Sequence, residues 1–151
     1  MNNEAPVLTG IRGRAGIITL NRPQAMNALT HEMVTLIADA LIQWRDHDEV
    51  DLIIIQGAGE RAFCAGGDVV SLYEDALAEG EAGARFWAEE YELNQLIADY
   101  PKPYIALMHG FVLGGGVGVS AHGSHRIVTD STRIGMPETG IGFIPDVGGS
   151  Y

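Results

Sequence analysis

The sequence has one cysteine, few basic residues and no long apolar run. Cys64 stands alone among 151 residues, which excludes an internal disulfide and a cysteine-based zinc site, and we expect it to be a small buried hydrophobe. With 9 Lys and Arg against 20 Asp and Glu, the formal net charge of −11 disfavours nucleic acid as a partner. No apolar run reaches the ~18–20 residues that span a bilayer, so no membrane partner is expected. The N-terminal segment lacks the pattern of a signal peptide, and we expect a cytoplasmic location.

The length suits one sizeable hydrophobic core. The 151 residues are 46% hydrophobic, which is enough for one domain and too little for two. Glycine is abundant, with 20 residues, and 11 of them fall between Gly110 and Gly149. Such a cluster indicates unusual turns or a close approach of the backbone to a ligand. Because no closing element follows it, we expect residues 1–151 to form the N-terminal core of a domain, incomplete at its C-terminal side.

Apolar periodicity predicts an α/β protein. Residues 7–12 and 15–20 are typical of a β-hairpin, and residues 31–46 of a helix with Thr30 as its N-cap. Residues 68–100 carry nine acidic residues against one base, and helical periodicity returns toward their end, so we expect a solvated helical excursion. Continuous apolar runs of strand length favour a parallel sheet buried on both faces. The other expected elements are strands at 52–56, 104–108 and 125–129, a helix at 117–122 and a short extended piece at 132–135.

Two glycine-rich turns each follow an apolar strand. They cover residues 62–68 and 109–118. A helix that begins at glycine exposes unpaired N–H groups, and two such donors from separate turns can hold one carbonyl oxygen that becomes negative during a reaction. The turns therefore predict an oxyanion hole, and glycines that only allow close packing of helix against strand are the structural alternative.

Other glycine-loop chemistries fit the second turn poorly. The segment 116–121 matches only the degenerate G-x-G-x-x-A form of the dinucleotide pattern, which is a weak signal by itself. Ser120 is not in a G-x-S-x-G nucleophile elbow, because the second glycine falls at Gly123. No G-x-x-x-x-G-K-[ST] phosphate loop occurs. These mismatches argue against nucleotide binding and serine hydrolysis.

Two acidic residues lie in the apolar, glycine-rich end of the chain. Glu138 and Asp146 are eight positions apart, and neither has an adjacent basic residue. Carboxylates in apolar surroundings have raised pKa values and suit acid–base or nucleophilic catalysis. A surface turn is the more common place for a lone aspartate, so from the residues alone both interpretations stay open.

Four motifs stand out along the chain: Asn21-Arg22-Pro23 with Met26-Asn27-Ala28-Leu29, residues 62–68, Gly114-Gly115-Gly116-Val117-Gly118, and Met136-Pro137-Glu138 with Pro145-Asp146-Val147-Gly148-Gly149. In order and spacing they resemble the crotonase (enoyl-CoA hydratase/isomerase) superfamily, and within it most closely the 3-hydroxyisobutyryl-CoA hydrolases. The resemblance runs from about residue 7 to the end of the chain.

The resemblance implies a fold and a site. The fold is a β-β-α spiral with roughly perpendicular parallel sheets, continued in longer relatives by helices that this sequence lacks. The backbone N–H groups of Gly67 and Gly115 would form the oxyanion hole, Glu138 matches the catalytic glutamate, and Asp146 matches the acid characteristic of the hydrolases. Glu90 matches a position that contacts substrate, although its acid-rich helix makes a plain solvated role a strong alternative. We expect alanine at Gly115 to be a clean probe of the hole, since a helix start tolerates alanine.

The activity implied is hydrolysis of a short β-hydroxyacyl-CoA thioester of the 3-hydroxyisobutyryl-CoA type. No cofactor or metal is expected beyond the CoA of the substrate. Gly118 stands where the hydratases carry a second catalytic glutamate, which disfavours hydration. Enoyl-CoA hydration or isomerisation with Glu138 alone, and a non-catalytic fragment, are the alternatives. A homo-oligomer or a complementing C-terminal segment are the protein partners considered.

Overall fold

The computed structural model describes residues 5–150, which form two sheets and four α-helices. The larger sheet has the strand order β1-β2-β3-β5-β7 and the smaller β4-β6-β8. The strands are β1 (Val7–Arg12), β2 (Ala15–Leu20), β3 (Leu52–Gly57), β4 (Ala62–Cys64), β5 (Tyr104–Met108), β6 (Phe111–Leu113), β7 (His125–Val128) and β8 (Arg133–Gly135). The helices are α1 (His31–Arg45), α2 (Val69–Leu77), α3 (Ala82–Ala98) and α4 (Gly115–Ala121), with 3-10 turns η1 (Pro23–Ala25) and η2 (Pro137–Ile141).

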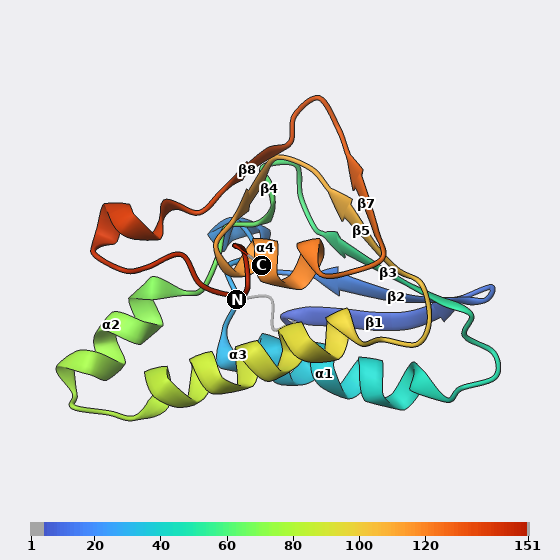
Figure 1. Cartoon of the computed structure of the whole chain (residues 1–151), viewed down its shortest axis with the longest axis horizontal. Helices are drawn as coiled ribbons and strands as arrows, with labels where there is room; N and C mark the ends of the chain where they lie inside the picture. The colour runs from blue at the N-terminus through green and yellow to red at the C-terminus, as the bar shows by residue number, and fades with distance from the viewer. Residues whose placement is uncertain (1–4, 151) are drawn as a thin grey trace.

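The strand pairing confirms the α/β class. β1 and β2 form the expected antiparallel hairpin, in which Val7 faces Leu20. Every other neighbouring pair in both sheets is parallel. Figure 1 shows the smaller sheet rising away from the larger one, with α4 between them and α1 and α3 side by side along the lower edge. Chain segments that are distant in sequence therefore meet near the start of α4.

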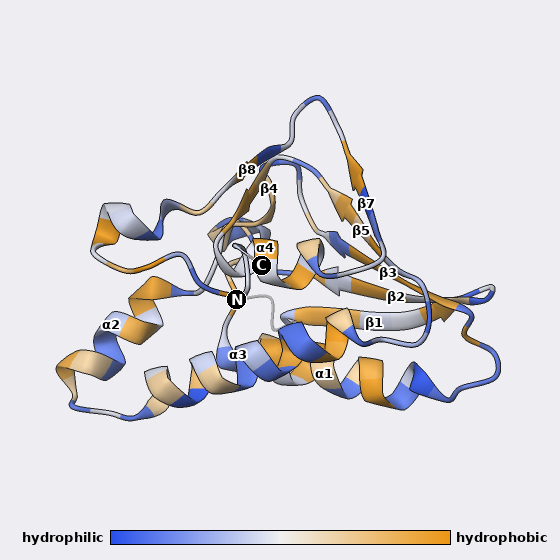
Figure 2. Ribbon diagram, in the orientation of Figure 1, coloured by the Kyte–Doolittle hydropathy of each residue, from blue (hydrophilic) through white to orange (hydrophobic). Residues whose placement is uncertain are grey.

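The main core lies between the larger sheet and the helices on one of its faces. Ile18 and Ile53 on the sheet, and Ile37 and Leu41 on α1, are fully buried in this layer. α1 begins where the sequence predicts, because the Thr30 hydroxyl accepts a hydrogen bond from the Met33 N–H. Figure 2 shows the resulting apolar stripe of α1 against polar residues on its other side.

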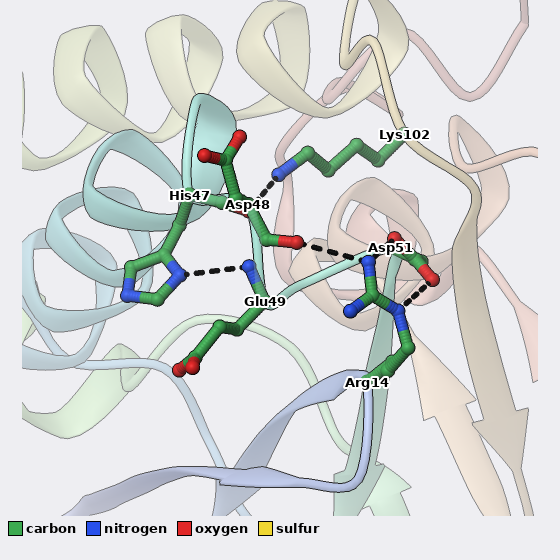
Figure 3. Close-up of polar contacts among 6 residues, drawn as sticks. All are labelled: Arg14, His47, Asp48, Glu49, Asp51 and Lys102. Carbon is green, nitrogen blue, oxygen red and sulfur yellow. Dashed lines mark hydrogen bonds and ion pairs between the residues drawn. The ribbon is translucent and has the colours of Figure 1, made fainter.

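Polar side chains fasten the connection between α1 and β3 (Figure 3). The Lys102 ammonium donates to the backbone carbonyls of Trp44 and His47 at 2.5 and 2.9 Å, where the negative end of the α1 dipole favours a cation. Arg14 pairs with the Asp51 carboxylate and lowers its pKa below the ordinary range. Arg14 also donates to the Asp48 carbonyl at 2.9 Å. These contacts join the β1–β2 hairpin and the chain before β5 to the end of α1 and to the loop that leads into β3.

The structure divides several predicted segments more finely. The acidic excursion comprises two helices, α2 and α3, and the helix expected from Val117 begins at Gly115. The glycine-rich turns contain the short strands β4 and β6, which the sequence did not indicate. A strand of three residues is too short to show a reliable alternation of apolar and polar positions. Together with β8, these strands form the second sheet and set the direction of both glycine turns.

Candidate active site

The two glycine turns leave neighbouring strands of the smaller sheet and converge. β4 and β6 pair in parallel, and they lead into α2 and α4 respectively. Gly114 has φ +48°, and an ideal Cβ there would lie 2.6 Å from Glu138 Oε1, so glycine is required for both conformation and space. The Gly67 nitrogen lies 3.4 Å from the ideal Cβ position of Gly115. The predicted pair of backbone donors is thus brought together.

The N–H groups of Gly67 and Gly115 are available to a ligand. Among residues 5–150, no backbone hydrogen bond outside the helices and strands uses either of them as donor. Gly115 is also the first residue of α4, whose N–H has no acceptor within the helix. Two unpaired donors this close are suited to a single oxygen that gains negative charge.

One cavity of about 460 Å³ is lined by all five residues singled out by the sequence. These residues come from five different parts of the chain: Gly67, Glu90, Gly115, Glu138 and Asp146. Apolar side chains from α2, α3 and the last loop complete the wall, and two of them, Trp87 and Phe143, stack at 5.2 Å between ring centroids. A larger cavity of about 660 Å³ lies over β1 to β3 and contains none of the five.

Glu90 is a buried carboxyl group and not a solvated helix residue. Only 2% of it is exposed, and its Oε1 makes no hydrogen bond to any described residue. An ideal Cβ on Gly115 would lie 2.4 Å from that oxygen, so the carboxyl faces the start of α4. Burial, followed by the charges of Asp146 and Glu138, raises the pKa of Glu90 to about 8. At neutral pH Glu90 is therefore largely protonated.

Asp146 is held by a tyrosine that the sequence analysis missed. The Tyr91 hydroxyl donates to Asp146 Oδ2 at 2.8 Å. The next residue, Val147, has φ +47°, an unfavourable conformation for a β-branched side chain, and its carbonyl accepts from His122 Nε2 at 2.6 Å. Neither Tyr91 nor His122 belongs to a motif, so no local signal identified them.

Close packing explains why residue 118 is glycine. An ideal Cβ at this position would lie 2.7 Å from Asn94 Oδ1 and 2.9 Å from the Cβ of Val147. The side chain of Asn94, on α3, thus occupies the space beside α4 that a residue larger than glycine would need. A carboxylate cannot project from position 118 without displacing Asn94 and Val147.

Two other residues considered in the sequence have structural roles. The Ser120 hydroxyl is buried and donates to the Gly116 carbonyl at 2.7 Å, one turn back in α4, so it is not a free nucleophile. Cys64 is fully buried, and burial raises the pKa of its thiol to about 12. Its expected role as a small core residue fits this environment.

The protonation of Glu90 predicts a pH-dependent stability. Its pKa is higher in the folded protein than the ordinary value of 4.5, so the folded state binds the proton more tightly and the free energy of unfolding falls as pH rises from about 4.5 to about 8. In the Glu90→Gln variant we expect the free energy of unfolding to decrease over this pH range by at least about 1.4 kcal/mol less than in the wild type, the equivalent of one pKa unit. Urea unfolding at a series of pH values measures it. Glu92→Gln, on the exposed side of α3, is the control, and parallel profiles for wild type and Glu90→Gln would contradict the assignment.

The fold and the cavity define an α/β protein in which two glycine turns and three carboxyl groups face one site. A model of the family described as "Enoyl-CoA hydratase/isomerase" matches residues 15–151. The chain belongs to this family. The resemblance inferred from the four motifs is thereby confirmed.

Curated relatives agree on a narrower group. The mitochondrial 3-hydroxyisobutyryl-CoA hydrolase of Danio rerio is 52% identical over 139 residues, which are 92% of this chain and 36% of that protein. The protein of the same name from Rattus norvegicus is 50% identical over 147 residues, 97% of this chain and 38% of that one. The chain therefore spans 36% and 38% of the length of these relatives. The expected cytoplasmic location is wrong by this comparison, because both relatives are named as mitochondrial.

Solved structures confirm the crotonase-type fold. A carnitinyl-CoA dehydratase from Mycobacterium thermoresistibile has a TM-score of 0.96 and 55% identity, over 98% of this chain and 44% of that one. An enoyl-CoA hydratase from Rhodobacter sphaeroides has a TM-score of 0.93 and 50% identity, over 97% and 44% of the two chains.

No helix among residues 5–150 is long and apolar enough to cross a membrane.

Proposed function

We propose that the complete protein hydrolyses a short β-hydroxyacyl-CoA thioester of the 3-hydroxyisobutyryl-CoA type to the free acid and CoA. The observation that carries the proposal is the convergence of two free backbone donors, Gly67 and Gly115, with the buried carboxyl groups of Glu90 and Glu138. The curated relatives named above support the substrate class. Free CoA and the acid are the products, and CoA is needed only as part of the substrate.

Catalysis would begin with the thioester oxygen accepting hydrogen bonds from the Gly67 and Gly115 N–H groups. A carboxylate oxygen of Glu138 attacks the carbonyl carbon, or takes a proton from a water that attacks it, and the tetrahedral oxyanion forms. The C–S bond then breaks and CoA leaves as the thiolate, which takes up a proton. In the first route, water hydrolyses the resulting anhydride and restores Glu138. Asp146 would orient Glu138 or the acyl hydroxyl, and Glu90 would contact the substrate in its protonated form.

Hydration or isomerisation of an enoyl-CoA is the second candidate, because the two solved structures described above carry dehydratase and hydratase names at 55% and 50% identity. The space beside Gly118 argues against it. Asn94 and Val147 fill the volume that a second carboxylate would require, and hydration needs a pair of groups to position and activate the added water.

We expect the complete protein to hydrolyse 3-hydroxyisobutyryl-CoA or 3-hydroxypropionyl-CoA faster than it hydrates crotonyl-CoA. The physical reason is that the oxyanion hole serves both reactions, whereas the second carboxylate serves only hydration. Release of free thiol and loss of the enoyl absorbance, measured as kcat/KM on one preparation, compare the two. If kcat/KM for crotonyl-CoA hydration equals or exceeds kcat/KM for thioester hydrolysis, the assignment as a hydrolase is wrong.

A further inference from the structure

The carboxamide of Asn94 is a buried polar group that has no hydrogen-bond partner among residues 5–150. Asn94 is 7% exposed, and neither its Oδ1 nor its Nδ2 makes a hydrogen bond within the described part of the chain. Among those residues, the other buried side-chain oxygens without a partner are one on Glu90 and one on Glu138. Buried polar atoms are nearly always hydrogen-bonded in folded proteins. All of the exceptions here belong to three residues, and two of the three line the candidate active site.

Asn94 stands next to that site on the same helix. It follows Glu90 by four residues in α3, so the two side chains project from the same side, one turn apart. Asn94 borders a second cavity, of about 640 Å³, together with Tyr91, Asp146 and Val147. Asp146 lines both this cavity and the one that contains Gly67 and Gly115. The cavity of the two backbone donors and the cavity of Asn94 therefore share Asp146 as a wall residue.

The surroundings restrict the group that Asn94 can bind. Its amide offers donors on Nδ2 and an acceptor on Oδ1, and both are unused. An anionic group is disfavoured by the acidic side chains of Glu138 and Asp146 in the adjoining cavity. A plain hydrocarbon would leave both amide atoms buried and unpaired. A hydroxyl group is neutral, donates one hydrogen bond and accepts others, and so matches both atoms.

We propose that Asn94 binds the hydroxyl group of the acyl chain and makes the site selective for hydroxylated over unsubstituted acyl-CoA thioesters. The inference rests on the proposed function for the identity of the thioester. It assigns a specificity-determining role to a residue outside the four motifs. Gly118 is the complementary feature, because only glycine at that position leaves room for the carboxamide.

The test compares 3-hydroxyisobutyryl-CoA with isobutyryl-CoA, which lacks only the hydroxyl group, on the complete protein. We expect the wild type to favour the hydroxylated thioester by at least ~10²-fold in kcat/KM, since a site built to pair a hydroxyl rejects an analogue without it. In Asn94→Leu this preference should fall to within about threefold, through loss on the hydroxylated substrate. Gln43→Leu is the matched control, because Gln43 is exposed on α1 and lines neither of the two cavities.

Three further outcomes distinguish a role of Asn94 in specificity from a role in packing or folding and from a failure of the proposed reaction. If Asn94→Leu lowers kcat/KM equally for both thioesters, Asn94 serves packing and the proposal is wrong. If that variant does not fold, binding of non-hydrolysable thioether analogues with and without the hydroxyl to the wild type decides, and equal affinities overturn the proposal. If the wild type hydrolyses neither thioester, the proposed function fails, while the same thioether measurement still supports or overturns the role of Asn94.

Discussion

Replacing Glu138 by glutamine is expected to lower turnover of the complete protein by at least ~10²-fold, the lower end for a positioned acid–base or nucleophilic group. Glu138 lies in η2, is 9% exposed, and its Oε2 has no hydrogen-bond partner among residues 5–150. Its other oxygen is packed against Gly114, beside the backbone donor of Gly115. Glutamine has nearly the same shape, so it removes the basic and nucleophilic oxygen while preserving the contacts. Affinity for CoA should change little.

The measurement pairs single-turnover kinetics with thermal unfolding of the same sample. Glu92→Gln makes the same chemical change on the exposed side of α3 and should leave turnover unchanged. Near-normal turnover in folded Glu138→Gln would show that the catalytic group is misassigned. Label in the Glu138 carboxyl after one turnover of wild-type enzyme in ¹⁸O-water would establish the anhydride route, because water oxygen enters that carboxyl only when an anhydride is hydrolysed at its protein side.

Alanine at Gly115 is expected to lower turnover by about 10²–10³-fold, the cost of one oxyanion donor. The structure corrects the expectation that this is a clean probe. The new Cβ would lie 2.4 Å from Glu90 Oε1 and 3.2 Å from Leu29 Cδ1, so the methyl group must displace the Glu90 carboxyl as well as crowd the space between the two donors. At Gly67 the nearest atoms are those of the Phe86 ring, at 3.4 and 3.5 Å, which is ordinary contact.

A second background separates these two effects. In Glu90→Ala the clash with the Glu90 carboxyl is gone and the 3.2 Å approach to Leu29 Cδ1 remains. Further loss of turnover on adding Gly115→Ala, in protein that stays folded, then reports on the space between the two donors. If the double variant is no slower than Glu90→Ala alone, the proposed hole is wrong and the single substitution acts only through Glu90. Gly10→Ala in β1 is the control, because a Cβ there meets no atom within 4 Å. Thermal unfolding accompanies each assay.

Features that depend on neighbouring residues could be predicted from the sequence. The hairpin of β1 and β2 and the start of α1 at Thr30 follow from apolar periodicity and capping, which act within a few residues. The motif residues around Gly115 and Glu138 were identified because their spacing is a local property of the chain. The family was inferred correctly for the same reason.

The way in which these segments meet could be seen only in the folded structure. β4 and β6 are too short to predict, yet their parallel pairing places Gly67 beside Gly115. Glu90 belongs to an acid-rich stretch whose composition indicates a solvated face, and it is buried because α3 packs against α4 at a run of glycines. Its raised pKa, and the unpaired amide of Asn94 one turn away, depend on burial and on charges contributed by distant segments. Desolvation and Coulomb interactions act through space, so no window of neighbouring residues contains them.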